Sequence, residues 1–264
     1  MQHADALTVT VMAIFGGLIL LFLWRARRGH IPYVRPIAGI TAMEEAVGRA
    51  TELGRPVIFV MGLTDVRDII TYASLSVLEY VARLAARLRT PFRALVLKPD
   101  VYPFAESAVH NAYRLEGAAE AFNSREQVQF LSDNTIIFAM TAGQMIAELP
   151  AGCALFIGQF DFTSLLMTEP GSQAGVLQIA GDPTLGQVPF FVCTCDYTII
   201  GEEYYAASSY VSSDPAMRGG LVSQDLIKVV FASLIVAGLA ARLLYDCGAW
   251  WMKDVVMALT RYSS

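Results

Sequence analysis

The sequence predicts an α/β protein with a Rossmann-like, mostly parallel sheet of five or six strands. Short, continuously apolar runs alternate with longer amphipathic segments through the middle of the chain, a pattern typical of a parallel sheet covered by helices on both faces. The connections between the first four runs are long enough for right-handed crossovers. Apolar segments flank this region, and they predict an N-terminal transmembrane helix and a second one near the C-terminus.

The first flanking segment, "ALTVTVMAIFGGLILLFLW", occupies residues 6–24 and contains no charged residue. A helix of this length matches a hydrocarbon core of about 30 Å. Arg25, Arg27 and Arg28 follow it, whereas Asp5 precedes it, so the positive-inside rule places the N-terminus outside and the next domain in the cytoplasm. A cleaved signal peptide would have basic residues in front of the apolar segment and a small-residue cleavage site behind it. This segment has neither feature. We therefore expect an anchor in the inner (cytoplasmic) membrane.

The elements of the central region follow from their periodicity. Residues 71–90 carry apolar side chains at three-to-four spacing, which indicates an amphipathic helix. Strands are predicted at residues 55–62, 93–100, 128–133, 154–160, 175–181 and 188–195, and helices at 71–90, 105–122, 134–149, 163–171 and 197–211. Only residues 182–187 separate the last two predicted strands, so we expect a hairpin with one antiparallel strand or an irregular connection.

The second flanking segment, "LIKVVFASLIVAGLAARLLY", covers residues 226–245. Lys228 and Arg242 lie near its ends, where long basic side chains can reach the headgroups, and small residues between 232 and 241 allow close helix packing. The alternative is an amphipathic helix that packs on a partner. The expected division is an anchor at 1–30, a cytoplasmic α/β domain at 31–223, and a transmembrane helix with an amphipathic tail at 224–264.

The composition limits the classes of function. Apolar residues make up 55% of the chain and charged residues 16%, against roughly 45–50% and 25% in soluble domains, which favours membrane segments. The net charge of −5 argues against a nucleic-acid partner. The four cysteines and three histidines show no metal-ligand spacing, so we expect reduced thiols, no metal and no cofactor.

An acidic residue lies near the end of almost every predicted strand. Ligands of parallel α/β sheets bind at the carboxyl ends of the strands, and the strand-end acids include Asp182. The candidate ligand-binding residues on this edge are Asp65, Asp100, Asp133, Asp161, Asp196, Thr198 and Glu202. Asp-x-Thr recurs at positions 133, 161 and 196, and we expect the three copies to meet at one edge of the sheet. The alternative is that each aspartate only caps a helix.

The common catalytic motifs are missing from the chain. Only Gly62 stands where a dinucleotide fold has G-x-G-x-x-G, and neither a Walker A sequence nor a G-x-S-x-G turn occurs. No histidine lies near a predicted strand end. We therefore assign no catalytic residues from the sequence, which favours a role without catalysis over an enzyme and leaves both open.

The segment "IAGDP…GQVPFFVCTCDYTIIGEEYYAASSY", residues 179–210, resembles a family of bacterial membrane-anchored proteins whose central α/β domain is a domain of unknown function. The resemblance covers most of the central region and the second apolar segment. It implies two membrane anchors, and it implies no activity and no site residues.

Together these observations predict a membrane-anchored structural or assembly subunit. Its cytoplasmic domain would oligomerise or dock onto a larger membrane complex, so the expected partners are the membrane and other membrane-protein subunits or a second copy. The alternative is a small-ligand sensor or enzyme that binds a nucleotide or a divalent cation at the acidic edge.

Overall fold

The computed structural model of the protein describes residues 38–149 and 151–212, and in the flanking segments residues 15–17, 20, 24, 28, 225, 227–233, 235–240 and 243. The chain divides into two units, one formed by residues 34–214 and the other by residues 1–33 and 215–264. Each unit is described by itself below.

The larger unit is built on one sheet of six strands in the order β3-β2-β1-β4-β5-β6. Every neighbouring pair is parallel, which confirms the predicted Rossmann-like α/β architecture. The strands are β1 (Val57–Met61), β2 (Phe92–Val96), β3 (Val128–Phe130), β4 (Cys153–Ile157), β5 (Leu177–Asp182) and β6 (Tyr197–Ile200). The strand order reverses between β1 and β4, which is therefore the topological switch point.

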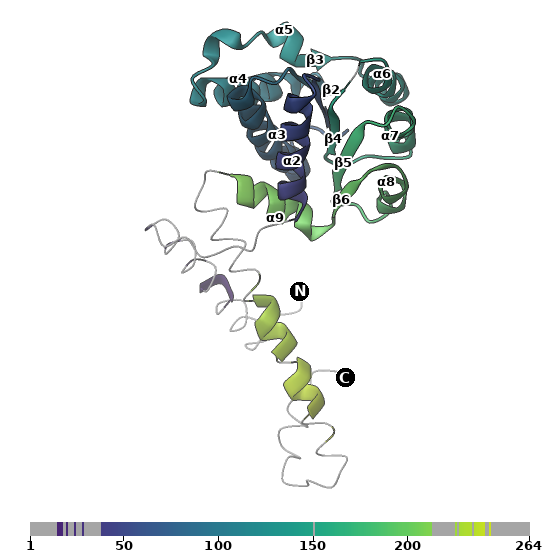
Figure 1. Ribbon diagram of the computed structural model, residues 1–264. Coiled ribbons are helices and arrows are strands. Elements are labelled where there is room, and N and C mark those ends of the chain that lie inside the picture. Colours follow the sequence, from purple (N-terminus) through teal and green to yellow (C-terminus); the bar gives the residue numbers. More distant parts are fainter. Residues whose placement is uncertain are drawn as a thin grey trace. The chain divides into compact units, whose positions relative to one another are not determined.

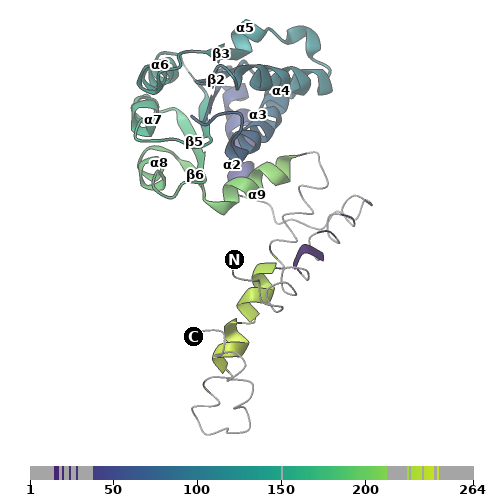
Figure 2. The same cartoon turned by 180° about the vertical axis from the view of Figure 1, so that it is seen from behind.

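Helices cover both faces of the sheet, so the domain has three layers (Figures 1 and 2). One face packs against α2 (Ala38–Glu52), α3 (Ile69–Leu88), α4 (Tyr102–Leu115) and α9 (Glu202–Val211), and the other against α6 (Thr135–Glu148), α7 (Ser164–Gln173) and α8 (Val188–Thr194). The short helices η1 (Ala119–Ala121) and α5 (Ser124–Gln127) precede β3.

Burial on both faces explains why the strands are continuously apolar. In β1, Phe59 belongs to the core between the sheet and the α2–α3 layer, whereas Ile58 and Val60 belong to the core on the α6–α7 side. Successive side chains of a strand point to opposite faces, and here both faces are dry. All five residues of β1 are buried.

The end of the sheet differs from the sequence-based prediction. Residues 188–194, predicted as a strand, form helix α8, and β6 lies at residues 197–200, where a helix was expected. Hence α8 is a short crossover and β6 is parallel to β5, so no antiparallel hairpin forms. Pro189 stands in the first turn of α8, where its fixed φ angle suits a helix and its missing N–H costs nothing.

At the switch point the backbones of Gly62 and Gly158 are in contact. A Cβ atom on Gly62 would lie 2.6 Å from the backbone nitrogen of Gln159, and one on Gly158 would lie 2.6 Å from the nitrogen of Gly62. The N–H of Gly62 donates to the carbonyl of Ile157 (3.0 Å), and the N–H of Leu63 donates to the carbonyl of Gln159 (2.9 Å). Pairing therefore continues past the ends of β1 and β4.

Both ends of the domain lie beside β6. Near the start of α2, Gly39 packs against the side chain of Ile199 with no room for a Cβ atom. The last helix, α9, follows β6 directly and is held to α3 by Tyr204, whose hydroxyl donates to the carbonyl of Ile70 (2.9 Å) and bonds the hydroxyl of Ser74 (2.7 Å). The hydroxyl of Tyr204 is buried, and this burial raises its pKa.

In the smaller unit, the described residues are mainly helical and apolar. The rings of Phe15 and Phe231 stack with their centroids 4.8 Å apart, and the guanidinium of Arg28 lies over the ring of Trp24. Most of the predicted span at residues 6–24, and parts of the one at 226–245, lie outside the described residues. Among the described residues, one helix is long and apolar enough to cross a membrane, and it is α3, which is largely buried in the domain core.

The glycine contact at the switch point gives a stability prediction. Gly158 has φ of +144°, so Gly158→Ala introduces both backbone strain and a clash with Gly62. We expect the free energy of unfolding to fall by about 2 kcal/mol or more, measured by urea unfolding of the full chain in mild detergent. Gly48→Ala is the control, because Gly48 lies inside α2 with open space around it, and the change should raise stability by about 0.5–1 kcal/mol. Equal stability of Gly158→Ala and the wild type would contradict the close contact.

Candidate functional site

The carboxyl edge of the sheet carries most of the acids that the sequence singled out. Asp65, after β1, pairs with the ammonium of Lys98 at 3.3 Å. Asp100, after β2, accepts a hydrogen bond from the backbone N–H of Val66 at 3.3 Å. These two carboxylates therefore join the loops after β1 and β2 to each other.

The first two Asp-x-Thr copies also lie at the carboxyl edge, and they differ in detail. At the start of α6, Asn134 is the capping residue, and its side-chain oxygen accepts the N–H groups of Ile136 and Ile137 (3.0 and 3.1 Å), while Asp133 is exposed. Before α7, Asp161 accepts both the N–H (2.9 Å) and the hydroxyl (2.6 Å) of Thr163. Asp161 therefore stabilises the turn before α7. At α6 the capping residue is Asn134, and Asp133 does not cap the helix.

The third Asp-x-Thr copy lies at the opposite edge. Asp196 precedes β6, so it stands at the amino edge of the sheet, and the expected convergence of the three copies is wrong. Its carboxylate accepts the N–H of Gln178 at 2.7 Å, which fixes the start of β6 on β5. Thr198 is a half-buried residue within β6, and Glu202 opens α9 on the carboxyl side. The error has one cause, the assignment of residues 188–195 as a strand.

The buried acid of the carboxyl edge is Asp182, at the end of β5, with 2% of its surface exposed. Its carboxylate accepts the N–H of Phe160 (2.9 Å) and the N–H of Thr184 (2.6 Å), so it ties the loop after β4 to the loop after β5. Burial raises the pKa of Asp182, and these hydrogen bonds offset part of that effect. Among the residues that the structure describes, no group of His, Cys, Asp or Glu side chains is arranged to hold a metal ion.

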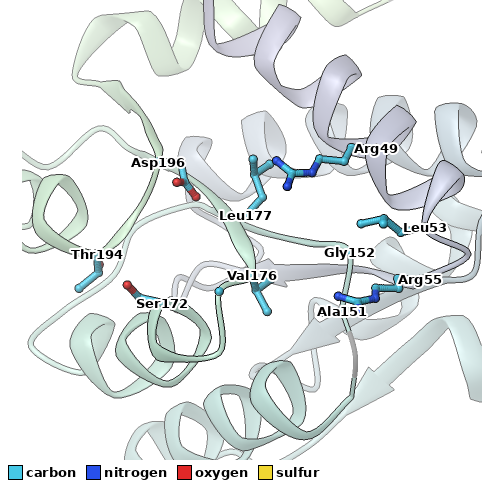
Figure 3. Close-up of a pocket in the computed structure, with 11 residues that line it drawn as sticks. Arg49, Leu53, Arg55, Ala151, Gly152, Ser172, Val176, Leu177, Thr194 and Asp196 are labelled. Atoms are coloured by element: carbon cyan, nitrogen blue, oxygen red, sulfur yellow. The ribbon is translucent and has the colours of Figure 1, made fainter.

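A pocket of about 300 Å³ opens at the amino edge of the sheet (Figure 3). Its walls come from the ends of α2, α7 and α8 and from the chain just before β4, β5 and β6. The lining residues are Arg49, Leu53, Arg55, Ala151, Gly152, Ser172, Gly175, Val176, Leu177, Thr194 and Asp196. This volume is at the lower limit for small-ligand sites in proteins, which are roughly 300–1,000 Å³.

A tight turn at the end of α2 places two arginines on this pocket. Gly54 has φ of +62°, its N–H donates to the carbonyl of Thr51 (3.0 Å), and the N–H of Arg55 donates to the carbonyl of Ala50 (2.9 Å). This hydrogen-bond pattern is a Schellman motif, which reverses the chain at a helix end. The backbone of Arg55 therefore returns to Ala50 at the end of α2, and Arg49 and Arg55 both line the pocket.

A second Schellman motif, at the end of α7, forms the opposite wall. Gly175 has φ of +69°, its N–H donates to Ser172 (3.1 Å), and the N–H of Val176 donates to Gly171 (3.0 Å). Backbone N–H groups thus satisfy the carbonyls of Ala50 and Thr51 in α2 and of Gly171 and Ser172 in α7. This pocket was not predicted from the sequence, and no helix was predicted at residues 38–52. Gly54 and Gly175, which each follow a helix end in the structure, are the signal that could have located these turns.

The protein thus contains a three-layer α/β domain whose strand order is Rossmann-like. An apolar segment lies on each side of this domain in the sequence. The chain belongs to the family described as a domain of unknown function, DUF6754, whose model matches residues 1–251. No curated protein and no solved structure matches it.

Asp182 gives a prediction for the pH dependence of stability. Its pKa in the folded protein is raised above the usual 3.8, so the folded state holds a proton that the unfolded chain has already released. The free energy of unfolding must then fall as the pH rises from about the usual aspartate pKa through the raised value. In Asp182→Asn this fall should be missing, as measured by urea unfolding at a series of pH values. Asp133→Asn, at an exposed position, should keep the wild-type profile, and an unchanged profile in Asp182→Asn would contradict the assignment.

Proposed function

We propose that this protein is a membrane-anchored assembly subunit whose α/β domain docks onto other subunits of a membrane complex. The observation that carries the proposal is a set of large, exposed apolar side chains where α6, α7 and α8 begin. This set, the apolar rim, consists of Ile136, Ile137, Met140, Phe162, Leu166 and Leu185. Phe162 and Leu185 expose 70% and 71% of their surface.

The position of the apolar rim supports docking. Single exposed apolar residues are ordinary on protein surfaces, but contiguous patches mark interaction sites. The three helices are neighbours in one layer (Figure 1), and each begins just after a strand, so the rim follows the carboxyl edge of the sheet. Other α/β proteins place ligand-binding loops there. In this domain the backbones of Gly62 and Gly158 touch at the switch point, and the neighbouring loops present apolar side chains.

Membrane anchoring is supported by the flanking segments. Residues 6–24 contain no charge, and the apolar residues Val229, Ile235 and Val236 each expose more than 60% of their surface, which suits contact with lipid. The stacked rings of Phe15 and Phe231 join the two segments. The arginines at 25, 27 and 28 favour a cytoplasmic α/β domain and an outer N-terminus.

The alternative is a small-ligand sensor or enzyme that uses the acidic carboxyl edge. Most of the carboxylates there have partners within the protein: Asp65 pairs with Lys98, Asp161 with Thr163, and Asp182 with two backbone N–H groups. These interactions give each of the three carboxylates a structural role in joining loops or forming a turn, and the ammonium of Lys98 offsets the negative charge of Asp65. This pattern favours the assembly role.

Native cysteines give a test of the membrane topology. Cys193 is exposed on α8, whereas Cys153 is buried. Burial raises the pKa values of the Cys153 and Cys195 thiols to about 12. Because the thiolate is the reactive form, these two thiols should react slowly with a maleimide. In a Cys195→Ser, Cys247→Ser background, a membrane-impermeant maleimide should label Cys193 in inverted membrane vesicles and not in right-side-out vesicles. The same background with Cys193→Ser is the control for signal at other positions. Labelling of Cys193 in right-side-out vesicles alone would reverse the proposed orientation.

The apolar rim gives a test of docking. The triple change Ile137→Ser, Phe162→Ser and Leu185→Ser should reduce the particle mass in mild detergent to that of one chain, measured by light scattering and native mass spectrometry. Because these side chains are exposed, the thermal stability of the domain should change little. The matched control is Phe104→Ser with Leu115→Ser, two exposed apolar residues on α4, which should leave the mass unchanged. A wild-type particle that is already a single chain without partners would rule out the assembly role.

A further inference from the structure

We propose that the amino-edge pocket binds a small organic anion, through a phosphate or carboxylate group held by Arg49 and Arg55. The inference does not rest on the assembly role and concerns the opposite edge of the sheet. Figure 3 shows Arg49 and Arg55 entering the pocket from the side of α2, with the guanidinium of Arg49 extending towards Leu177, and Asp196 on the far side.

The two arginines have no anionic partner among the residues that the structure describes. The ion pairs found there join Arg83 to Glu116 and Lys98 to Asp65, and neither involves Arg49 or Arg55. Both arginines are exposed and line the same pocket, so an anion that enters from solvent can reach their guanidinium groups. Guanidinium groups bind phosphate and carboxylate through two parallel hydrogen bonds.

Helix capping does not explain the arginines. A basic side chain in the last turn of a helix often binds the last free carbonyls, and Arg49 occupies that turn of α2. However, the Schellman motif already satisfies the carbonyls of Ala50 and Thr51 through the N–H groups of Arg55 and Gly54. Neither of these two carbonyls therefore needs an arginine side chain as its donor.

Close backbone packing and buried hydrogen bonds also fix the shape of the pocket. Gly152 forms part of the lining and packs so closely on Ala50 that a Cβ atom would lie 2.6 Å from its Cα. Behind the pocket, the amide nitrogen of Gln178 donates to the carbonyls of Thr168 and Thr194, both at 2.9 Å. A site that is already formed loses little entropy when a ligand binds.

Asp196 indicates that the ligand carries a hydrogen-bond donor as well as an anionic group. One of its oxygens accepts the N–H of Gln178, and no hydrogen bond within the described part of the chain uses the other. A ligand that fits both sides of the pocket has an anionic group at one end and an amino or hydroxyl group at the other. Leu53, Val176 and Leu177 line the space between, which suits a short hydrocarbon linker.

Two matched probes test this assignment on the full chain in mild detergent. Phosphoethanolamine and β-alanine each join an amine through two methylene groups to a phosphate or a carboxylate. At constant ionic strength, we expect at least one of them to bind saturably by calorimetry, with chloride as the reference anion. Arg49→Gln and Arg55→Gln should each raise the Kd about tenfold, since each removes a charge-assisted hydrogen-bond pair, and the double variant should abolish detectable binding.

Matched variants separate binding from folding. Arg125→Gln removes an exposed arginine outside the pocket, and it should leave the Kd unchanged. Asp196→Asn should remove the preference for phosphoethanolamine over inorganic phosphate while inorganic phosphate still binds. Binding of neither probe, or equal binding to the wild type and the double arginine variant when both unfold at the same temperature, would overturn the proposal.

A further titration in lipid nanodiscs identifies whether the anionic group belongs to a lipid headgroup or to a soluble molecule. The phosphoethanolamine titration is repeated in nanodiscs of phosphatidylcholine with and without phosphatidylethanolamine. Weaker apparent binding of the soluble probe in the mixed nanodiscs would show that the lipid headgroup occupies the pocket. Equal binding in both nanodiscs would assign the pocket to a soluble anion, and either result supports the anion site.

Discussion

The contact between Gly62 and Gly158 is the constraint on which the arrangement of the domain depends. Strand pairing continues beyond β1 and β4 through the N–H groups of Gly62 and Leu63, so the two halves of the sheet are joined at the point where the strand order reverses. In dinucleotide-binding domains the chain opens at this point and a phosphate group enters. Here the backbone itself fills that position, and both candidate interaction surfaces lie elsewhere, on the apolar rim and at the amino edge.

The fold could be predicted because its signals are local. β1 and β4 are buried on both faces and therefore continuously apolar, and the helices between them are amphipathic. The prediction failed at residues 188–200, because a short apolar run is compatible with a helix or a strand. Pro189 was the local sign of a helix start. That single error reversed the direction of the last element and moved Asp196 to the wrong edge.

The candidate sites were less predictable than the fold because they depend on residues distant in sequence. The acids at the carboxyl edge were found, yet their partners were not: the bond from Phe160 to Asp182 depends on how two loops meet. The amino-edge pocket brings together Arg49, Ser172 and Asp196, and no spacing rule connects them. Only the turns at Gly54 and Gly175 had a signal in the sequence, namely a glycine after a helix.

The position of both domain ends beside β6 has a mechanical consequence. The chain enters through α2, where Gly39 touches Ile199, and leaves through α9, which follows β6. A pull on either flanking segment would therefore load the same margin of the sheet, and the bonds of Tyr204 to Ile70 and Ser74 would carry part of that load into α3. The opposite margin, at β3, bears none of it directly. The pairing of β6 with β5 is therefore the part of the sheet that a pulling force would test first.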